Sequence, residues 1–505
     1  MRRNCTPHRS AARRSLLVAT TAACFGAGAL LTTTAAATSV PAGDPDAEVV
    51  AGFVIEPTNL NIITQAGAAL DQLLLGNIYE TLVKSTPDGE ISPGLADLEI
   101  SEDRLTYTLT VHDGVTFHDG DPLTASDVVW TLEQQREGNE AARLSRIETV
   151  EAPDDATVVI TLSEPDNDLA FHLSQRAGAV LNEGATDLEN TANGTGPFVL
   201  DEWNQGSSIT LVRNDDYWGE PASIAAITFQ YFTDPNAAAN ALLDGDIDLH
   251  VRIDTDLVEQ FEDNPDYVIT DGPTNGEFTL GMNNADEVLS DQRVRQAITQ
   301  AIDKQGLIDL YRGYATLIGA PVPPFEAWYE DLSELYPFDP DAARALLEEA
   351  GYADGLELSF VAPNIYPTYA LDYVVSQLAD VGITVSLETV EFATWIEQVY
   401  VNHDYDLTVV LHVEPRDIDN YANPEYYWLY DSAEVQDLLG QARTTQDPDE
   451  FVELRRQAAA LIAEEAPAVW LLLYNDVTVA RAGLSGYPTF DANARFDAHD
   501  ITVES

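Results

Sequence analysis

The residue patterns that covalent chemistry needs are missing from this sequence of 505 residues. It has no Gly-x-Ser-x-Gly motif that would present a nucleophilic serine and no P-loop that would cradle phosphates. Two carboxylates could act as general acid and base, but in a chain with 86 acidic residues their adjacency carries no information. We therefore expect a protein that is not an enzyme and has no cofactor, and we keep a secreted hydrolase as an alternative.

The histidines do not indicate a metal site either. Beyond the first 37 residues the chain has seven of them: His112, His118, His172, His250, His403, His412 and His499. No two have the HExxH spacing, which places two imidazoles on one face of a helix. Turn or surface positions explain these histidines better, so we expect no metal site.

Residues 412–421 are the strongest candidate for binding a ligand, because they are rich in charges and aromatic rings and follow the strand that we expect at residues 406–411. Loops at strand ends are where α/β proteins usually bind ligands. Arg416 could hold a carboxylate through two parallel hydrogen bonds, and Trp395 and Tyr421 could form apolar walls around a ligand. The alternatives are a surface loop with incidental charges and aromatic rings that belong to the core.

The net charge restricts the partners. It is formally −62; the first 37 residues hold five arginines and no acid, which leaves 19 basic against 86 acidic residues in the remainder, or −67. Such a surface repels nucleic acid and anionic lipid, so we expect neither as a partner. With only two lysines, Lys84 and Lys304, the acidic chain suggests a saline or acid-tolerant habitat, which is a hypothesis.

The first 37 residues have the features of a secretory signal peptide: a basic segment, an apolar run at 16–31 and three alanines ending at Ala37. The run is too short and too rich in alanine to favour a permanent membrane span. Arg13 and Arg14 are compatible with twin-arginine export. A lipid anchor on Cys24 is the alternative to cleavage near Ala37, which we favour. Both cysteines lie in this segment, so the mature chain would have neither a disulfide nor a thiol.

Strands and helices alternate along the rest of the chain. Thr124 and Asp127 have the spacing of a capping box, and Asp-Pro pairs at 339 and 447 mark helix starts. We expect strands at residues 49–55, 105–111, 154–162, 224–232, 356–361, 384–390 and 406–411, and helices at residues 72–83, 124–135, 237–243, 291–303, 342–350 and from 447 to before Pro467.

Two stretches resemble a known family. Residues 193–218 combine glycine turns with apolar residues at two-residue spacing, which predicts a β-hairpin. Residues 105–128 run from an alternating strand through two Asp-Gly turns into a capped helix. In this order they resemble the oligopeptide, dipeptide and nickel class of extracytoplasmic solute-binding proteins, solute-binding family 5, which are the ligand-capturing subunits of ABC importers. The resemblance covers nearly the whole chain after residue 37.

The resemblance implies a fold and a domain order. The fold would be α/β, a two-lobed periplasmic-binding-protein-like fold of class II type, with an additional small α/β domain inserted in the first lobe. Domain I would comprise residues 38–70, 190–271 and 475–505, domain II residues 71–189, and domain III residues 272–474.

The resemblance also implies a function. The protein would be an extracytoplasmic, monomeric subunit that captures short peptides by hinge closure and delivers them to the membrane subunits of an importer. Asp417, or Asp419 as second choice, would face the α-ammonium group of the peptide, since a desolvated cation needs a charge-assisted partner. Glu56 would lie in a turn at the rim of the ligand cleft. An oligosaccharide or a metal chelate in the same role is the alternative.

Overall fold

We describe the protein from a computed structural model, which covers residues 44–65, 67–86, 90–489 and 495–504. The expected signal peptide and Cys24 lie outside these residues. Within the chain, Gly43–Ser505 make up one unit.

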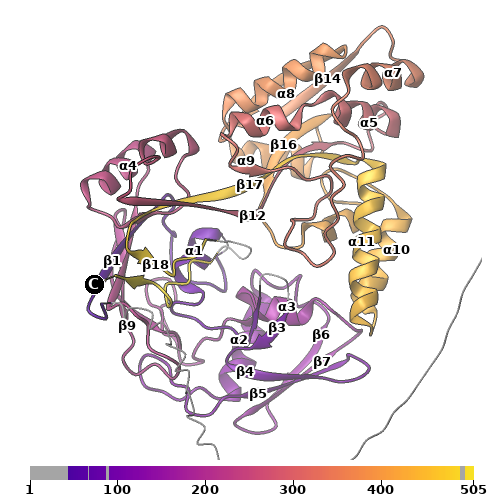
Figure 1. Ribbon diagram of the computed structural model, residues 1–505. Helices are drawn as coiled ribbons and strands as arrows, with labels where there is room; N and C mark the ends of the chain where they lie inside the picture. Colours follow the sequence, from indigo (N-terminus) through magenta and orange to yellow (C-terminus); the bar gives the residue numbers. More distant parts are fainter. Residues whose placement is uncertain (1–43, 66, 87–89, 490–494, 505) are drawn as a thin grey trace, which may run out of the picture. The chain divides into compact units, whose positions relative to one another are not determined.

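A large mixed sheet holds the strands in the order β15-β14-β16-β12-β17-β11-β1-β10-β9-β8, and β13 pairs with β17 beside this path. β14 pairs in parallel with β15 and β16, and β1 with β10 and β11, whereas β12 and β17 are antiparallel (Figure 1). The strands are β1 Glu48–Phe53, β8 Phe198–Asn204, β9 Ser208–Arg213, β10 Ala226–Tyr231, β11 Leu249–His250, β12 Tyr267–Met282, β13 Ala315–Thr316, β14 Leu356–Pro363, β15 Ile383–Val390, β16 Leu407–His412 and β17 Ala468–Arg481.

Three smaller antiparallel sheets accompany it in the described part of the chain. In the four-stranded sheet β4-β5-β7-β6, the apolar residues of β5 are buried at every second position, which confirms the alternating strand expected there. β2 pairs with β3, and β18 with β19. The strands are β2 Val83–Ser85, β3 Ile91–Pro93, β4 Ala96–Ile100, β5 Thr106–Val111, β6 Ile147–Glu151, β7 Thr157–Leu162, β18 Leu484–Ser485 and β19 Thr502–Val503.

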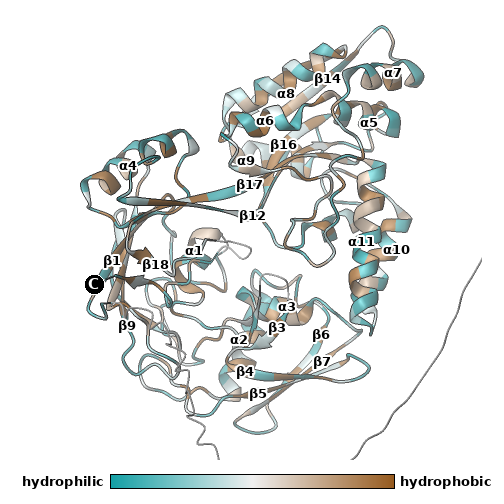
Figure 2. Cartoon of the chain, viewed as in Figure 1, coloured by the Kyte–Doolittle hydropathy of each residue, from teal (hydrophilic) through white to brown (hydrophobic). Residues whose placement is uncertain are grey.

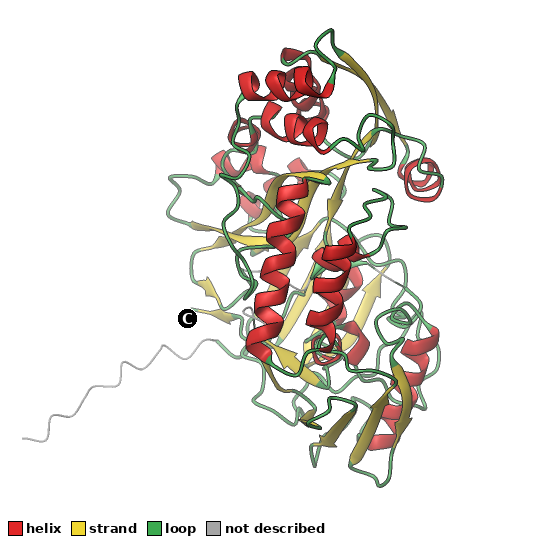
Figure 3. Ribbon diagram, turned by 90° about the vertical axis from the view of Figure 1, so that its right-hand side faces the viewer, coloured by secondary structure: helices red, strands yellow, loops and turns green. Residues whose placement is uncertain are grey.

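Helices are interspersed with these strands, as an α/β chain requires (Figure 3). Many of them carry both hydrophilic and hydrophobic residues, as the mixed colours of α7, α8 and α11 show (Figure 2). Within the described parts of the chain, no helix has the length and apolar character needed to cross a bilayer. The helices are α1 Ala68–Leu74, α2 Ala125–Glu137, α3 Leu169–Leu173, α4 Pro235–Asp244, α5 Gln292–Ala301, α6 Lys304–Leu310, α7 Pro340–Ala350, α8 Thr368–Asp380, α9 Phe392–Trp395, α10 Ala433–Thr444 and α11 Pro448–Glu465, with 3-10 helices η1 Arg176–Gly178, η2 Thr255–Gln260 and η4 Asp417–Ala422 and the π-helix η3 Ile396–Val401.

The large sheet is buried on both faces where β14, β16 and β17 lie. Successive side chains of a strand point to opposite faces. Val409 therefore packs in one core, formed with α5 to α8, and Val410 packs in a second core that includes residues of α10 and α11. This double burial explains why β16 is mostly apolar and lacks an alternating pattern.

The expected helix caps are confirmed. Thr124 and Asp127 form the capping box of α2. Asp339 and Asp447 accept hydrogen bonds from the first turns of α7 and α11, whose first residues are prolines. Because these caps depend only on local sequence, they could be recognised without tertiary information.

The helix expected over residues 72–83 is wrong. α1 ends at Leu74, because Gly76 adopts a left-handed conformation with φ 82°. The side chain of Asn77 then donates hydrogen bonds to the carbonyl oxygens of Leu73 (3.2 Å) and Phe496 (2.7 Å). Phe496 lies more than 400 residues away, so a contact that the local sequence does not show adds to the effect of Gly76 at this end.

β12 and β17 are the longest strands and connect the two halves of the large sheet. From Tyr267 to Pro273, β12 pairs with Arg481 to Asn475 of β17, and from Glu277 onward it pairs with Leu473 and the residues before it. Three residues, 274–276, therefore face one residue of β17. This β-bulge interrupts the ladder in the middle of both strands.

Lys304 offers a test of the packing around α6. Its side chain is buried, its Nζ lies 3.3 Å from the carbonyl oxygen of Ile318, and burial lowers its pKa to about 8. Below pH 8 the folded protein must hold this charge in an apolar site. Lys304→Met should therefore raise the free energy of unfolding by about 2 kcal/mol at pH 7, measured by urea denaturation. Since the wild type regains stability as its folded-state lysine deprotonates, the difference should shrink above pH 8 and vanish near pH 10.5. A difference that does not change with pH would contradict the assigned burial.

Candidate functional site

A cavity with a volume of about 570 Å³ lies at the bulge where β12 pairs with β17. All three bulge residues line it, together with the facing residues of β17 from Tyr474 to Val477. Thr274 fixes the bulge, because its hydroxyl donates to the carbonyl oxygen of Tyr474 (2.9 Å) and accepts from the backbone amide of Gly276 (2.8 Å). The remaining lining residues are Ala68, Arg252, Ile253, Asp254, Thr255, Asp256, Tyr311, Pro367, Tyr369, Leu411 and Val413.

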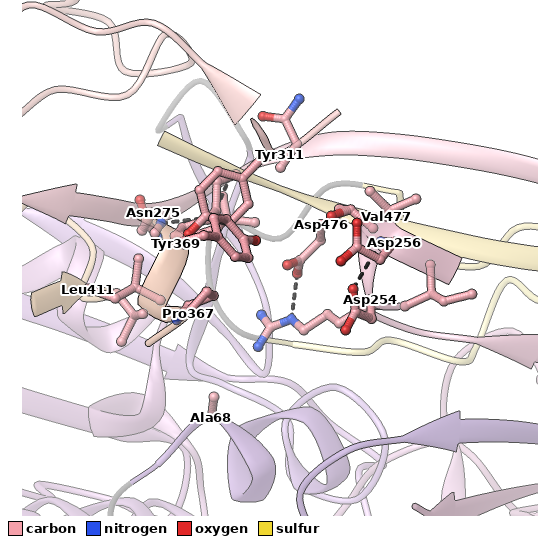
Figure 4. Close-up of a pocket in the computed structure, with 18 residues that line it drawn as sticks. Ala68, Asp254, Asp256, Asn275, Tyr311, Pro367, Tyr369, Leu411, Asp476 and Val477 are labelled. Carbon is pink, nitrogen blue, oxygen red and sulfur yellow. Dashed lines mark hydrogen bonds and ion pairs between the residues drawn. The ribbon is translucent and has the colours of Figure 1, made fainter. Parts of the chain in front are cut away.

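Three tyrosines, Tyr311, Tyr369 and Tyr474, line this cavity. Figure 4 shows Tyr311 and Tyr369 close together on one side of it. The ring centroids of Tyr311 and Tyr474 lie 5.1 Å apart in an edge-to-face arrangement, and the two hydroxyls are hydrogen-bonded at 2.7 Å. Tyr369 packs on Tyr311 with centroids 5.9 Å apart. Burial raises the pKa of all three phenols, so they stay neutral at physiological pH. The wall thus offers ring faces and uncharged hydroxyls to a ligand.

The opposite side of the cavity carries charges (Figure 4). Arg252 donates from Nε to Asp476 at 2.6 Å. Asp254 accepts from the backbone amide of Asp256 at the start of η2, and Asp256 in turn pairs with Arg312 at 3.2 Å. Three carboxylates against one lining guanidinium make this side acidic.

A second cavity of about 310 Å³ shares Ala68 and Val413 with the first. Residues 413–415, which follow β16, line it on one side. Its other side is lined by Gly67, Asp71, Leu75, Asn139, Glu140, Arg143, Phe171, His172, Gln175 and Arg176.

Ion pairs order the charged residues of the second cavity. Arg176 pairs with Asp71 at 2.8 Å. Arg143 lies 3.2 Å from Glu140 and 3.5 Å from Glu414, so it joins residues on the two sides. Burial lowers the pKa of His172 to about 3, so this imidazole is neutral over the physiological range.

The segment after β16, where the sequence predicts a binding loop, does reach both cavities, but only through its first residues: Val413 lines both, and Glu414 and Pro415 line the second. Arg416, Asp417 and Asp419 lie behind them. Asp417 is 6% exposed and accepts at Oδ1 from His412 (3.1 Å) and Asn420 (2.7 Å). Arg416 pairs with Asp168, and Asp419 pairs with Arg455 at 3.1 Å.

The other three expected residues also lie away from the two cavity walls. Trp395 is buried and donates to the hydroxyl of Thr408 at 2.8 Å. Tyr421 is buried in the same core and stacks on Trp428 with centroids 4.2 Å apart. Glu56 accepts from the indole of Trp203 (2.7 Å) and from the backbone of Gly206, and so holds the tip of the β8–β9 hairpin. A binding role for these residues stays a prediction.

Sequence reasoning missed the tyrosines and the bulge. Tyr311, Tyr369 and Tyr474 come from three distant segments, and no spacing in the sequence relates them. The bulge had a signal, since Pro273 and Gly276 stand within an otherwise β-like run, where such residues often mark an interruption.

No metal centre is found in the described ranges, where no three histidine, cysteine, aspartate or glutamate side chains are placed to hold an ion.

Comparisons with known proteins agree with this architecture. Residues 90–437 match the family model described as bacterial extracellular solute-binding proteins, family 5 Middle. The glutathione-binding protein GsiB of Salmonella paratyphi A (strain ATCC 9150 / SARB42) is 27% identical over 470 residues, which cover 86% of this chain and 91% of that protein. The oligopeptide-binding protein AppA of Bacillus subtilis (strain 168) is 27% identical over 492 residues, with 88% and 90% covered.

Among solved structures, the periplasmic binding protein DppA from Helicobacter pylori, in complex with the peptide STSA, superimposes with a TM-score of 0.76 at 24% identity. The match covers 91% of this chain and 98% of DppA. The two chains therefore share the expected two-lobed α/β fold.

Glu277 follows the bulge directly and allows a test of the electrostatics behind the cavity. It is fully buried, and burial, with the nearby charges of Asp417 and Glu326, raises its pKa well above the usual value. A raised folded-state pKa gives stability that is present below the unfolded pKa and is lost as pH rises. The uncharged analogue Glu277→Gln should therefore become progressively more stable than the wild type above pH 4.5, by at most about 1.4 kcal/mol per pH unit. Urea denaturation between pH 4.5 and 8 measures this. Glu348→Gln, at an exposed position of α7, controls for loss of a carboxylate, and equal slopes for both variants would contradict the prediction.

Proposed function

The chain belongs to the bacterial extracellular solute-binding proteins of family 5, and from this premise we propose that it captures short peptides for an ABC importer. In this role the protein binds its ligand between two lobes and delivers it to the membrane subunits of the importer, which recognise the closed form. No covalent step is needed.

The observation that carries the proposal is the position of the larger cavity. It lies where the β12–β17 ladder is interrupted and where residues of several distant segments meet, from Ala68 to Val477. A ligand at this place contacts both halves of the large sheet, so its binding energy favours an arrangement that brings them together.

The lining of the cavity supports a peptide ligand. A volume of about 570 Å³ suits a few amino-acid residues. Neutral tyrosine hydroxyls and the backbone of the bulge can hydrogen-bond to peptide groups whatever the side chains are, and the acidic side suits an ammonium group. The similar proteins named above are described as binding glutathione, oligopeptides or the peptide STSA.

Further parts of the assignment follow from the sequence. We propose that residues 1–37 direct export and are removed near Ala37, with a lipid anchor on Cys24 as the less favoured outcome. We also propose the three-domain division given above. Intact-mass analysis of the exported protein distinguishes cleavage near Ala37 from lipidation.

Isothermal titration calorimetry with tri- to pentapeptides tests the function, and mass spectrometry of the recovered peptides tests for turnover. We expect binding and intact peptides.

Tyr369→Ala should weaken binding about tenfold or more, because Tyr369 is 43% exposed and supplies part of the cavity wall. Tyr336→Ala removes the same ring away from both cavities and should leave the affinity unchanged. Binding only of oligosaccharides or of a nickel–histidine chelate would replace the peptide assignment, and hydrolysed peptide would overturn the assignment as a carrier.

Asp417 is proposed as the partner of the peptide ammonium group. His412 and Asn420 donate to Oδ1, so Oδ2 is the oxygen that a ligand would use. N-acetylation of the peptide should then weaken binding to the wild type about tenfold or more, and it should have little further effect on Asp417→Asn. Equal losses in the two proteins would show that Asp417 does not contact the ammonium group.

A further inference from the structure

Asp168 is a buried carboxylate that joins two separate cores of the protein. It follows β7 and precedes α3, whose Leu169 packs in the core of the four-stranded sheet. Its carboxylate is 2% exposed, and Arg455 of α11 donates to both of its oxygens at 3.0 Å. Arg416 donates to Oδ1 as well. Burial alone would raise the pKa of Asp168, but the charges of Arg455 and Arg416 outweigh it and hold the pKa below its usual range.

The two residues before Asp168 continue the contact. Asp166 accepts two hydrogen bonds from Arg443, at 3.1 and 2.9 Å. The side chain of Asn167 donates to the carbonyl oxygens of Ala442 (2.7 Å) and Thr445 (2.8 Å). These carbonyls belong to the C-terminal end of α10, where helix carbonyl groups lack partners within the helix. Residues 166–168 therefore dock as one unit on α10 and α11.

Arg416 connects this contact to the cavities. It directly follows residues 413–415, which line the second cavity. Arg416 has a left-handed backbone with φ 59°, which is unfavourable for a residue with a side chain and must be held by its surroundings. The surroundings are Asp168 and Phe171, since the guanidinium carbon lies 3.8 Å from the centroid of the Phe171 ring. The end of the segment that follows the cavity-lining residues is thus held by Asp168 and by Phe171 of α3.

Given the proposed function, on which this inference rests, we infer that residues 166–168 are a latch that stabilises the closed arrangement of the lobes, and that Asp168 is a positioning residue that holds residues 413–415 through Arg416. The latch is made when the four-stranded sheet and the α10–α11 pair meet, and it breaks when they part. Since its charges are buried, added salt screens it far less than it screens exposed pairs such as Arg312 with Asp256.

A latch acts on the equilibrium between the open and closed forms. Because ligand is retained by the closed form, a lower closed population lowers the apparent affinity by the same factor. Weakening the latch should therefore speed ligand release and leave association nearly unchanged.

Single-molecule fluorescence energy transfer can measure the two populations. The chain beyond residue 37 has no cysteine, so dyes can be placed with Glu102→Cys and Glu348→Cys, at exposed positions before β5 and in α7, in a Cys5→Ser, Cys24→Ser background. In the ligand-free protein, Asp168→Asn should raise the ratio of open to closed molecules at least tenfold, at both 0.15 M and 1 M NaCl. Asp168→Glu, which keeps the charge, should restore part of the closed population.

Asn167→Ala removes two hydrogen bonds of the latch and leaves no buried charge without a partner. If Asp168→Asn does not fold, this variant can still show whether the latch affects the ratio of open to closed molecules. It should shift the ratio in the same direction by a smaller factor. Asp341→Asn removes an aspartate–arginine pair that lies within α7 alone and is the matched control, with no shift expected. Unchanged populations in both Asp168→Asn and Asn167→Ala would overturn the latch.

A second experiment on the labelled proteins tests the latch and the peptide ligand separately. Trialanine to penta-alanine peptides are added to the labelled proteins. Longer closed dwell times in the wild type than in Asp168→Asn support both ideas. A population shift without any response to peptide supports the latch and counts against the peptide ligand, whereas equal dwell times with bound peptide overturn the latch and leave the peptide assignment standing.

Discussion

The pairing of β12 with β17 is the constraint on which the rest of the structure depends. These two strands carry the large sheet from β16 on one side to β11 on the other. Their ladder is interrupted at residues 274–276, where three residues oppose one. At such an interruption, the backbone groups of the extra residues do not take part in the regular hydrogen bonds of the ladder, and their side chains depart from the alternating directions of a strand. The larger cavity is lined by these residues, so the defect in the ladder and the candidate site are the same feature.

Much of the fold could be predicted because its signals are local. The capping box at Thr124 and Asp127 and the Asp-Pro starts of α7 and α11 need only neighbouring residues. The strand β16 was recognisable as an apolar run because both of its faces are buried. The helix expected over residues 72–83 was wrong because the local signal for its end, Gly76 with a left-handed backbone, was not weighed. The hydrogen bond from Asn77 to the carbonyl oxygen of the distant Phe496 supports the same end and could not be predicted from the local sequence.

The site could be predicted only in part. The sequence identified the segment after β16, which reaches both cavities through Val413 and the second cavity also through Glu414 and Pro415. It did not show which side chains face a ligand, because the tertiary fold turns Arg416 toward Asp168 and Asp417 toward His412. The group of three tyrosines at the cavity could not be predicted, because their rings meet only after the chain has folded. Charge density thus indicated the region and gave little information on individual residues.

The scarcity of lysine has a practical consequence. Of the two lysines, Lys304 is buried and Lys84 is exposed at β2. Apart from the amino terminus, an amine-reactive ester meets a single accessible side chain on the folded protein. Molecules coupled through Lys84 would therefore share one orientation on a biosensor surface, and the cavity at the β12–β17 bulge, which Lys84 does not line, would be left unmodified.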